Sequence, residues 1–131
     1  MAGRTIDELL AAARRGLVRL DAQAAARAVA QGAILVDIRS EAQRARDGVV
    51  PGAIHHSRNV LEWRADPTSE TRDPRIAGYD RHLVLLCDEG YQSSLAAATL
   101  QRLGLEHATD LVGGFQAWRA AGLPVQRLDG A

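Results

Sequence analysis

The chain contains one cysteine, Cys87, at a position where its thiol could act as a nucleophile. A mostly apolar run at 82–86 precedes Cys87, a loop containing Gly90 follows it, and residues 92–103 have the pattern of a helix. A cysteine between a strand and a helix N-terminus faces unpaired backbone N–H groups and the positive end of the helix dipole, which favour the thiolate. A lone cysteine is more often an ordinary buried residue, but the glycine-containing loop favours a nucleophile here.

Charged residues follow two further predicted strands. The aliphatic run 33–38 is typical of a strand buried on both faces of a parallel sheet, and its end carries Asp37 and Arg39. A second short strand is predicted at 53–56, with Arg58 after it. Because ligands bind at the carboxyl ends of the strands in open α/β sheets, we expect these residues and the cysteine loop to share one site.

The two arginines are expected to differ in role. Arg39 follows Asp37 by two residues, and a structural ion pair near the site is more common for such a pair than a contact with substrate. Arg58 lies between a strand and a helix, where Glu62, one helical turn later, is a possible partner. Arg58 is therefore a candidate for binding the substrate.

The elements that position these residues alternate along the chain, which indicates an α/β protein with a parallel sheet. Thr5 and Glu8 form a predicted capping box, and Asp21 and Asn59 are predicted to cap later helices. Helices are predicted at 6–17, 22–31, 40–47, 60–63, 92–103 and 115–121, and strands at 33–38, 53–56, 82–86 and 107–112.

Composition limits the possible functions. The chain has 131 residues, of which 47% are hydrophobic, and this is enough for one domain with a core. Its 16 basic and 16 acidic side chains cancel, so neither nucleic acid nor a membrane surface is an expected partner. No apolar stretch approaches the roughly 20 residues that span a bilayer. One cysteine and an N-terminus without an apolar core predict a soluble, cytoplasmic protein.

No metal or cofactor is expected. His55 and His56 are adjacent in a predicted strand, where neighbouring side chains face opposite sides of the sheet. No second cysteine or acidic cluster accompanies them, so a metal site is not predicted.

Four sequence segments in this order resemble the single-domain rhodanese family: 36–39, 48–54, the strand, loop and helix around Cys87, and 111–118. The resemblance implies a doubly wound parallel sheet of about five strands flanked by helices. The implied domain covers residues 18–127, and residues 1–17 would form a helical extension that packs on it. The resemblance also implies a sulfurtransferase in which Cys87 carries a persulfide.

The implied reaction moves a sulfane sulfur from a donor such as thiosulfate to a thiol or cyanide-like acceptor, or to a sulfur-relay protein. The loop after Cys87 is expected to surround the sulfur and bind the substrate through Asp88, Glu89, Gly90, Tyr91, Gln92 and Ser93. The family loop commonly has an arginine where this chain has Gln92. Two carboxylates also follow the cysteine directly, and they would disfavour a thiolate and repel a dianion. Thiosulfate is therefore expected to be a poor donor.

Two other functions compete with this prediction. A cysteine-dependent phosphatase or arsenate reductase would need an arginine at the sixth position after Cys87, where the chain has Ser93. A rhodanese-like sulfur carrier, sensor or binding module would receive its sulfur from a protein partner and turn over small donors slowly. The acidic loop could then select a basic partner.

Overall fold

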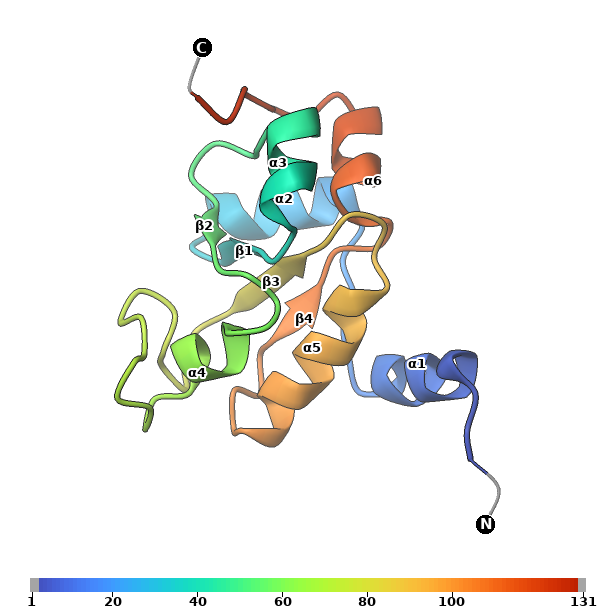
Figure 1. The fold of residues 1–131 in the computed structure, drawn as a ribbon, viewed down its shortest axis with the longest axis vertical. Coiled ribbons are helices and arrows are strands. Elements are labelled where there is room, and N and C mark those ends of the chain that lie inside the picture. Colours follow the sequence, from blue (N-terminus) through green and yellow to red (C-terminus); the bar gives the residue numbers. More distant parts are fainter. Residues whose placement is uncertain (1–2, 130–131) are drawn as a thin grey trace.

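The protein has a parallel sheet of four strands in the order β2-β1-β3-β4, seen in a computed structural model that describes residues 3–129 (Figure 1). The strands are β1 (Ile34–Asp37), β2 (Ile54–His55), β3 (Leu83–Leu86) and β4 (Thr109–Asp110). The residue pattern predicted these four strands, and the resemblance to the rhodanese family implied about five. The fifth position is reduced to a single parallel bridge between Leu20 and Leu111, on the β4 side of the sheet.

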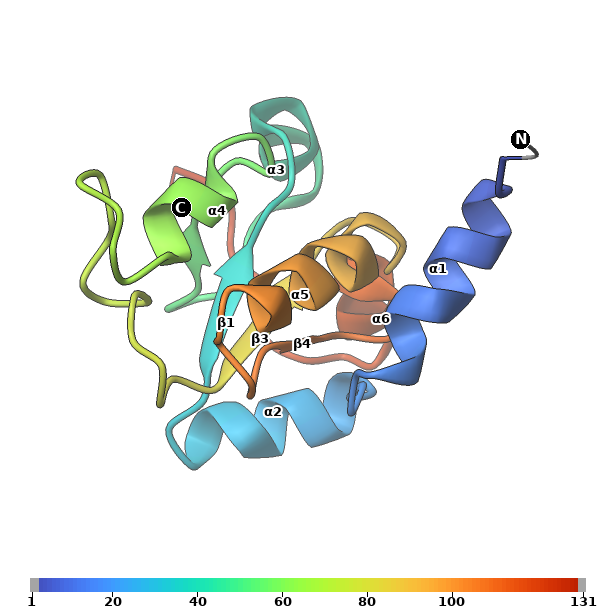
Figure 2. The ribbon, with the colours of Figure 1, turned by 90° about the horizontal axis from the view of Figure 1, so that it is seen from below.

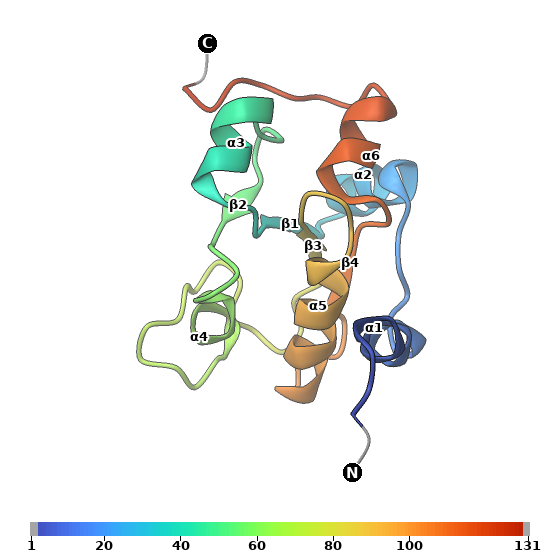
Figure 3. The same cartoon turned by 45° about the vertical axis from the view of Figure 1, so that its right-hand side comes forward.

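Helices cover both faces of this sheet, as the sequence predicted. α2 (Ala22–Ala30) and α6 (Gly114–Ala120) lie on one face, and α4 (Leu61–Ala65) and α5 (Gln92–Arg102) lie on the other (Figure 3). The side chains of β3 alternate between the two cores: Leu83 and Leu85 face α5, whereas Val84 and Leu86 face α6. All four are fully buried, which explains the unbroken apolar run before Cys87.

Two further helices lie outside these layers. α1 (Ile6–Arg15) packs along α5, on the side opposite to α4 (Figure 2). α3 (Glu41–Asp47) connects β1 to β2 beyond the carboxyl end of β1. Both begin at a capping box, Thr5 with Glu8 and Ser40 with Gln43, and the first of these confirms a prediction.

The predicted helix cap at Asn59 is wrong. Val60 is the N-cap residue of α4, and no side chain caps this helix. The side-chain oxygen of Asn59 instead accepts a hydrogen bond from the hydroxyl of Ser57. Local bonding within the turn competes with capping, which is common for short polar side chains.

Candidate active site

Cys87 directly follows β3, at the carboxyl edge of the sheet, and its side chain is almost completely buried. The Sγ atom accepts hydrogen bonds from the backbone N–H of Gly90 at 3.1 Å and of Ser93 at 3.4 Å. N–H groups directed at a sulfur favour its thiolate and any negative charge that replaces it.

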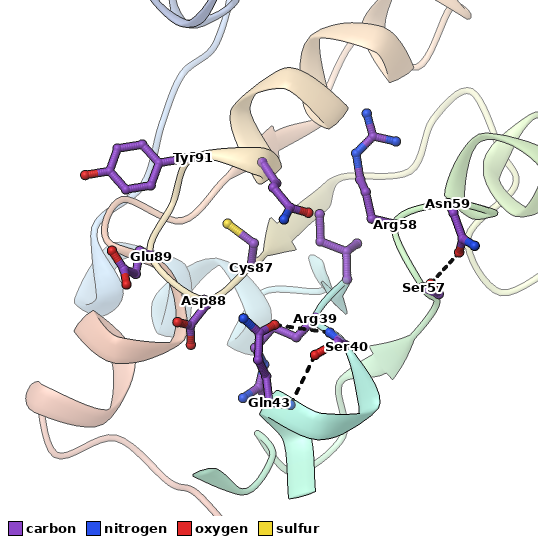
Figure 4. Close-up of a pocket in the computed structure, with 12 residues that line it drawn as sticks. Arg39, Ser40, Gln43, Ser57, Arg58, Asn59, Cys87, Asp88, Glu89 and Tyr91 are labelled. Carbon is purple, nitrogen blue, oxygen red and sulfur yellow. Dashed lines mark hydrogen bonds between the residues drawn. The ribbon is translucent and has the colours of Figure 1, made fainter. Parts of the chain in front are cut away.

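The cysteine lies at a cavity of about 610 Å³ (Figure 4). Most of the residues predicted for the site line this cavity: Arg39, Arg58, Cys87, Asp88, Glu89, Tyr91 and Gln92. Gly90 and Ser93 instead bind the sulfur from the loop. Five lining residues were not predicted for the site, and they lie after the ends of β1 and β2: Ile38, Ser40, Gln43, Ser57 and Asn59.

Gly90 allows the loop to turn tightly around the sulfur. Its φ of +89° is in the left-handed region, which other residues rarely adopt. A Cβ atom at this position would lie 2.7 Å from the backbone nitrogen of Gly113. Both the conformation and the space therefore require glycine.

The N-terminus of α6 holds the loop from the other side. The N–H of Phe115 donates to the Cys87 carbonyl at 2.8 Å, and the N–H of Gln116 donates to the Asp88 carbonyl at 3.1 Å. Gly114 makes this approach possible, because a Cβ atom there would lie 2.5 Å from the Cys87 carbonyl oxygen. Gly114 therefore brings the N-terminus of α6 against the backbone of Cys87.

Arg39 and Asp37 form a buried ion pair beneath the site. The two side chains meet at 2.8 Å, and the same guanidinium nitrogen of Arg39 donates to the Gly48 carbonyl at 2.8 Å. The guanidinium also stacks over the Phe115 ring at 3.8 Å. Arg39 lines the cavity but is only 2% exposed, and its charge is paired with Asp37.

Arg58 lines the cavity on the side opposite to Tyr91 and Glu89 (Figure 4). Its guanidinium pairs with Glu62 at 2.8 Å, which is the partner that the helical spacing suggested. The positive charge of Arg58 at the cavity is therefore balanced by Glu62, and its binding of substrate stays a prediction.

The acidic residues of the loop differ in their surroundings. Glu89 is exposed to solvent. Asp88 accepts a hydrogen bond from Gln116 at 2.9 Å and lies 3.7 Å from Arg46. Arg46 also binds Asp47 at 2.8 Å, and this hydrogen bond lowers the pKa of Asp47 to about 2. The rim of the cavity next to Asp88 thus carries both negative and positive side chains.

A buried carboxylate behind the loop was not predicted. Asp110 at the end of β4 is fully buried, and its Oδ2 accepts hydrogen bonds from the hydroxyls of Ser93 and Ser94, each at 2.7 Å. Arg19 pairs with the same carboxylate at 2.8 Å. The Ser93 oxygen also lies 3.3 Å from the Cys87 sulfur. Neither serine caps α5, which has no side-chain cap, because both hydroxyls bind Asp110.

The two histidines have partners within the protein. His55 bonds to the Arg39 carbonyl at 2.9 Å, and His56 bonds to Asp73 at 2.7 Å. Within residues 3–129, no group of three or more His, Cys, Asp or Glu side chains is arranged to hold a metal ion. No helix in this range is both long and apolar enough to cross a bilayer.

The fold and the site together define a class: parallel α/β proteins in which loop N–H groups surround a cysteine between a strand and a helix. The family model described as the rhodanese-like domain matches residues 21–121 of the chain. The protein belongs to the rhodanese-like family.

Three similar proteins extend this result. The chain is 34% identical over 90 residues to thiosulfate sulfurtransferase GlpE of Pseudomonas savastanoi pv. phaseolicola, a match that covers 69% of this chain and 76% of the relative. It is 31% identical over 97 residues to a sulfurtransferase of Allochromatium vinosum, covering 74% and 81%. A solved structure from Rhodopseudomonas palustris, of a protein of unknown function described as a possible tyrosine phosphatase, has a TM-score of 0.87 and 34% identity. That match covers 96% of this chain and 97% of the other, so it extends into the segment before residue 21.

Proposed function

We propose that this protein is a sulfurtransferase that carries a sulfane sulfur as a persulfide on Cys87. One observation carries the proposal: the Cys87 sulfur accepts hydrogen bonds from two backbone N–H groups. This sulfur lies at the edge of a cavity that is large enough for a small sulfur donor. The sulfurtransferases among its relatives support the same activity.

The reaction proceeds in two displacements. The Cys87 thiolate attacks the outer sulfur of a donor such as thiosulfate, the S–S bond of the donor breaks, and sulfite leaves with the electron pair. The resulting Cys87 persulfide is then attacked at its terminal sulfur by an acceptor, a thiol or cyanide, and the cysteine thiolate leaves. The N–H groups of Gly90 and Ser93 stabilise the negative charge in both steps.

The charge of the cavity affects which sulfur donor can bind. Arg39 and Arg58 are both paired with carboxylates, and Glu89 adds a negative charge at the rim. A dianion such as thiosulfate therefore meets little positive charge. We infer that the natural donor is less negatively charged than thiosulfate, or is a protein that delivers the sulfur directly.

A Gln92→Arg substitution tests this interpretation. Gln92 is exposed and lines the cavity, so an arginine there would offer a charged donor to the sulfonate oxygens of thiosulfate. We expect the KM for thiosulfate to fall about tenfold, measured by thiocyanate formation with cyanide as the acceptor. Gln23→Arg, at an exposed position of α2, adds the same charge elsewhere and should leave the KM unchanged. Equal kinetics in the parent and Gln92→Arg proteins would contradict the charge argument.

The proposed function is tested by intact-mass spectrometry of the purified protein after incubation with thiosulfate or with an alkyl persulfide. We expect an added mass of about 32 Da, one sulfur atom, that disappears when cyanide is added. The absence of this adduct with both donors, in a protein whose Cys87 still reacts with a thiol reagent, would overturn the proposal.

A phosphatase or arsenate reductase is the competing function, and the description of the Rhodopseudomonas palustris protein favours it. The sixth position after Cys87 is Ser93, and its hydroxyl is bound to Asp110. A phosphate in the loop would lack the guanidinium that binds its oxygens in bidentate fashion. We expect no vanadate-sensitive hydrolysis of para-nitrophenyl phosphate, and hydrolysis that requires Cys87 would favour the phosphatase.

The second rival is a sulfur carrier, sensor or binding module that is loaded by a protein. Tyr91 is 58% exposed at the cavity rim beside the exposed Glu89, which suits the docking of a partner with basic groups. Such a module would hold a Cys87 persulfide but turn over small donors negligibly. Rapid turnover of small donors would exclude the module.

The cytoplasmic location and the absence of nucleic acid and membrane partners stay predictions.

A further inference from the structure

Two arginines converge on a single carbonyl behind the cysteine loop. Nη2 of Arg14 donates to the Gly90 carbonyl oxygen at 2.8 Å, and Nη2 of Arg19 donates to the same oxygen at 3.1 Å. Arg14 belongs to α1, and Arg19 lies in the segment between α1 and α2. Both precede residue 21, where the match to the family model begins.

The carbonyl that they bind belongs to the residue whose N–H donates to the sulfur. Gly90 has a positive φ and no side chain, so its backbone has wide conformational freedom unless other contacts restrict it. In a trans peptide the C=O and the next N–H point in opposite directions. The two guanidinium groups therefore also direct the N–H of Tyr91 away from themselves.

The two arginines differ in charge balance. Arg19 is neutralised by its ion pair with the buried Asp110. Arg14 donates through Nε to the Ser94 hydroxyl at 3.0 Å, and within residues 3–129 no carboxylate lies within ion-pair distance of it. Arg14 thus adds an uncompensated positive charge to the back of the loop.

We propose that Arg14 and Arg19 are positioning residues for Cys87: they hold the Gly90 carbonyl on the outer side of the loop, and Arg14 supplies positive charge that the cavity lacks. The inference rests on the proposed role of Cys87 as a nucleophile. It gives α1 a part in setting the reactivity of the thiol, through a hydrogen bond to the loop rather than through contact with the substrate.

The test measures the rate of Cys87 alkylation by iodoacetamide between pH 5 and pH 10. Because the chain has one cysteine, the reaction reports on Cys87 alone. In Arg14→Gln we expect the alkylation rate at pH 7 to fall about threefold to tenfold, while the rate at pH 10 stays close to that of the parent. Arg14→Lys, which keeps the charge, should restore most of the parent profile.

Arg15→Gln is the matched control, because Arg15 is the next residue of α1 and is exposed. It removes the same charge from the helix and should leave the profile unchanged. A parent-like profile in Arg14→Gln, or an equal shift in Arg15→Gln, would overturn the proposal. Thermal melting of each variant verifies that all the proteins whose alkylation rates are compared are folded. Iodoacetamide carries no sulfane sulfur, so a protein that shows the Arg14 effect but forms no persulfide would contradict the proposed function and leave this inference standing.

Discussion

The Cys87→Ser protein is expected to transfer no sulfur from any donor. A serine hydroxyl is not ionised near neutral pH and cannot hold a sulfane sulfur as a persulfide, so both half-reactions lose their nucleophile. We expect turnover to fall at least about a thousandfold and the 32 Da adduct to be absent. Initial rates of thiocyanate or sulfide formation, together with the intact mass, measure both effects.

The fold of this variant should be retained. Serine is close to cysteine in size, and the N–H groups of Gly90 and Ser93 can donate to its hydroxyl as they do to the sulfur. We therefore expect a cooperative thermal transition similar to that of the parent. Because the chain has no second cysteine, a folded Cys87→Ser protein that still forms a sulfur adduct would refute the assignment of the nucleophile.

The second large effect is expected for Gly114→Ala. A Cβ atom at Gly114 would lie 2.5 Å from the Cys87 carbonyl oxygen and 2.7 Å from the carbonyl carbon and oxygen of Asp88. These atoms belong to the backbone of the cysteine loop, so relief of the clash must move either the loop or the start of α6. We expect a loss of about 3 kcal/mol in the free energy of unfolding, from overpacking and from the positive φ together.

Gly122→Ala is a close control for this experiment. Gly122 has a φ of +74°, similar to the +61° of Gly114, but a Cβ atom there would meet nothing within 4 Å. Gly122→Ala should lose only the part of the unfolding free energy that comes from the positive φ, about 1 kcal/mol. It should keep full activity. Urea unfolding measures both losses. Equal destabilisation in the two variants would show that the contact between α6 and the loop is not tight. Gly114→Ala should also lower sulfur transfer, because the carbonyls of Cys87 and Asp88 lose their N–H donors.

The elements themselves were largely predictable. The capping box at Thr5, the cap at Asp21 and the apolar runs before Arg39 and Cys87 are local signals, and each corresponds to an element of the structure. The four strands were also predicted, and the fifth strand that the resemblance implied is only a bridge at Leu20, which depends on a neighbouring segment for its pairing. Asn59 failed as a cap because it binds Ser57 within the same turn.

The candidate site was predicted in part. The loop after Cys87 and the position of Arg58 follow from the rule that strands of a parallel sheet end at the same edge. Local spacing suggested the partners Asp37 for Arg39 and Glu62 for Arg58, but only packing decides that Arg58 pairs with Glu62. Asp110 gave a weak signal, since a carboxylate in an apolar strand segment must have buried partners.

The sequence by itself determined the alternation of strands and helices, the family, and the placement of one thiol before a glycine-containing loop, because these features depend on residues that are close in the chain. Only the tertiary structure decided what surrounds that loop. Arg14 reaches Gly90 because α1 packs along α5, and Gly114 meets Cys87 because α6 returns to the end of β3. Contacts between such distant segments depend on how the layers pack, which local sequence patterns do not encode.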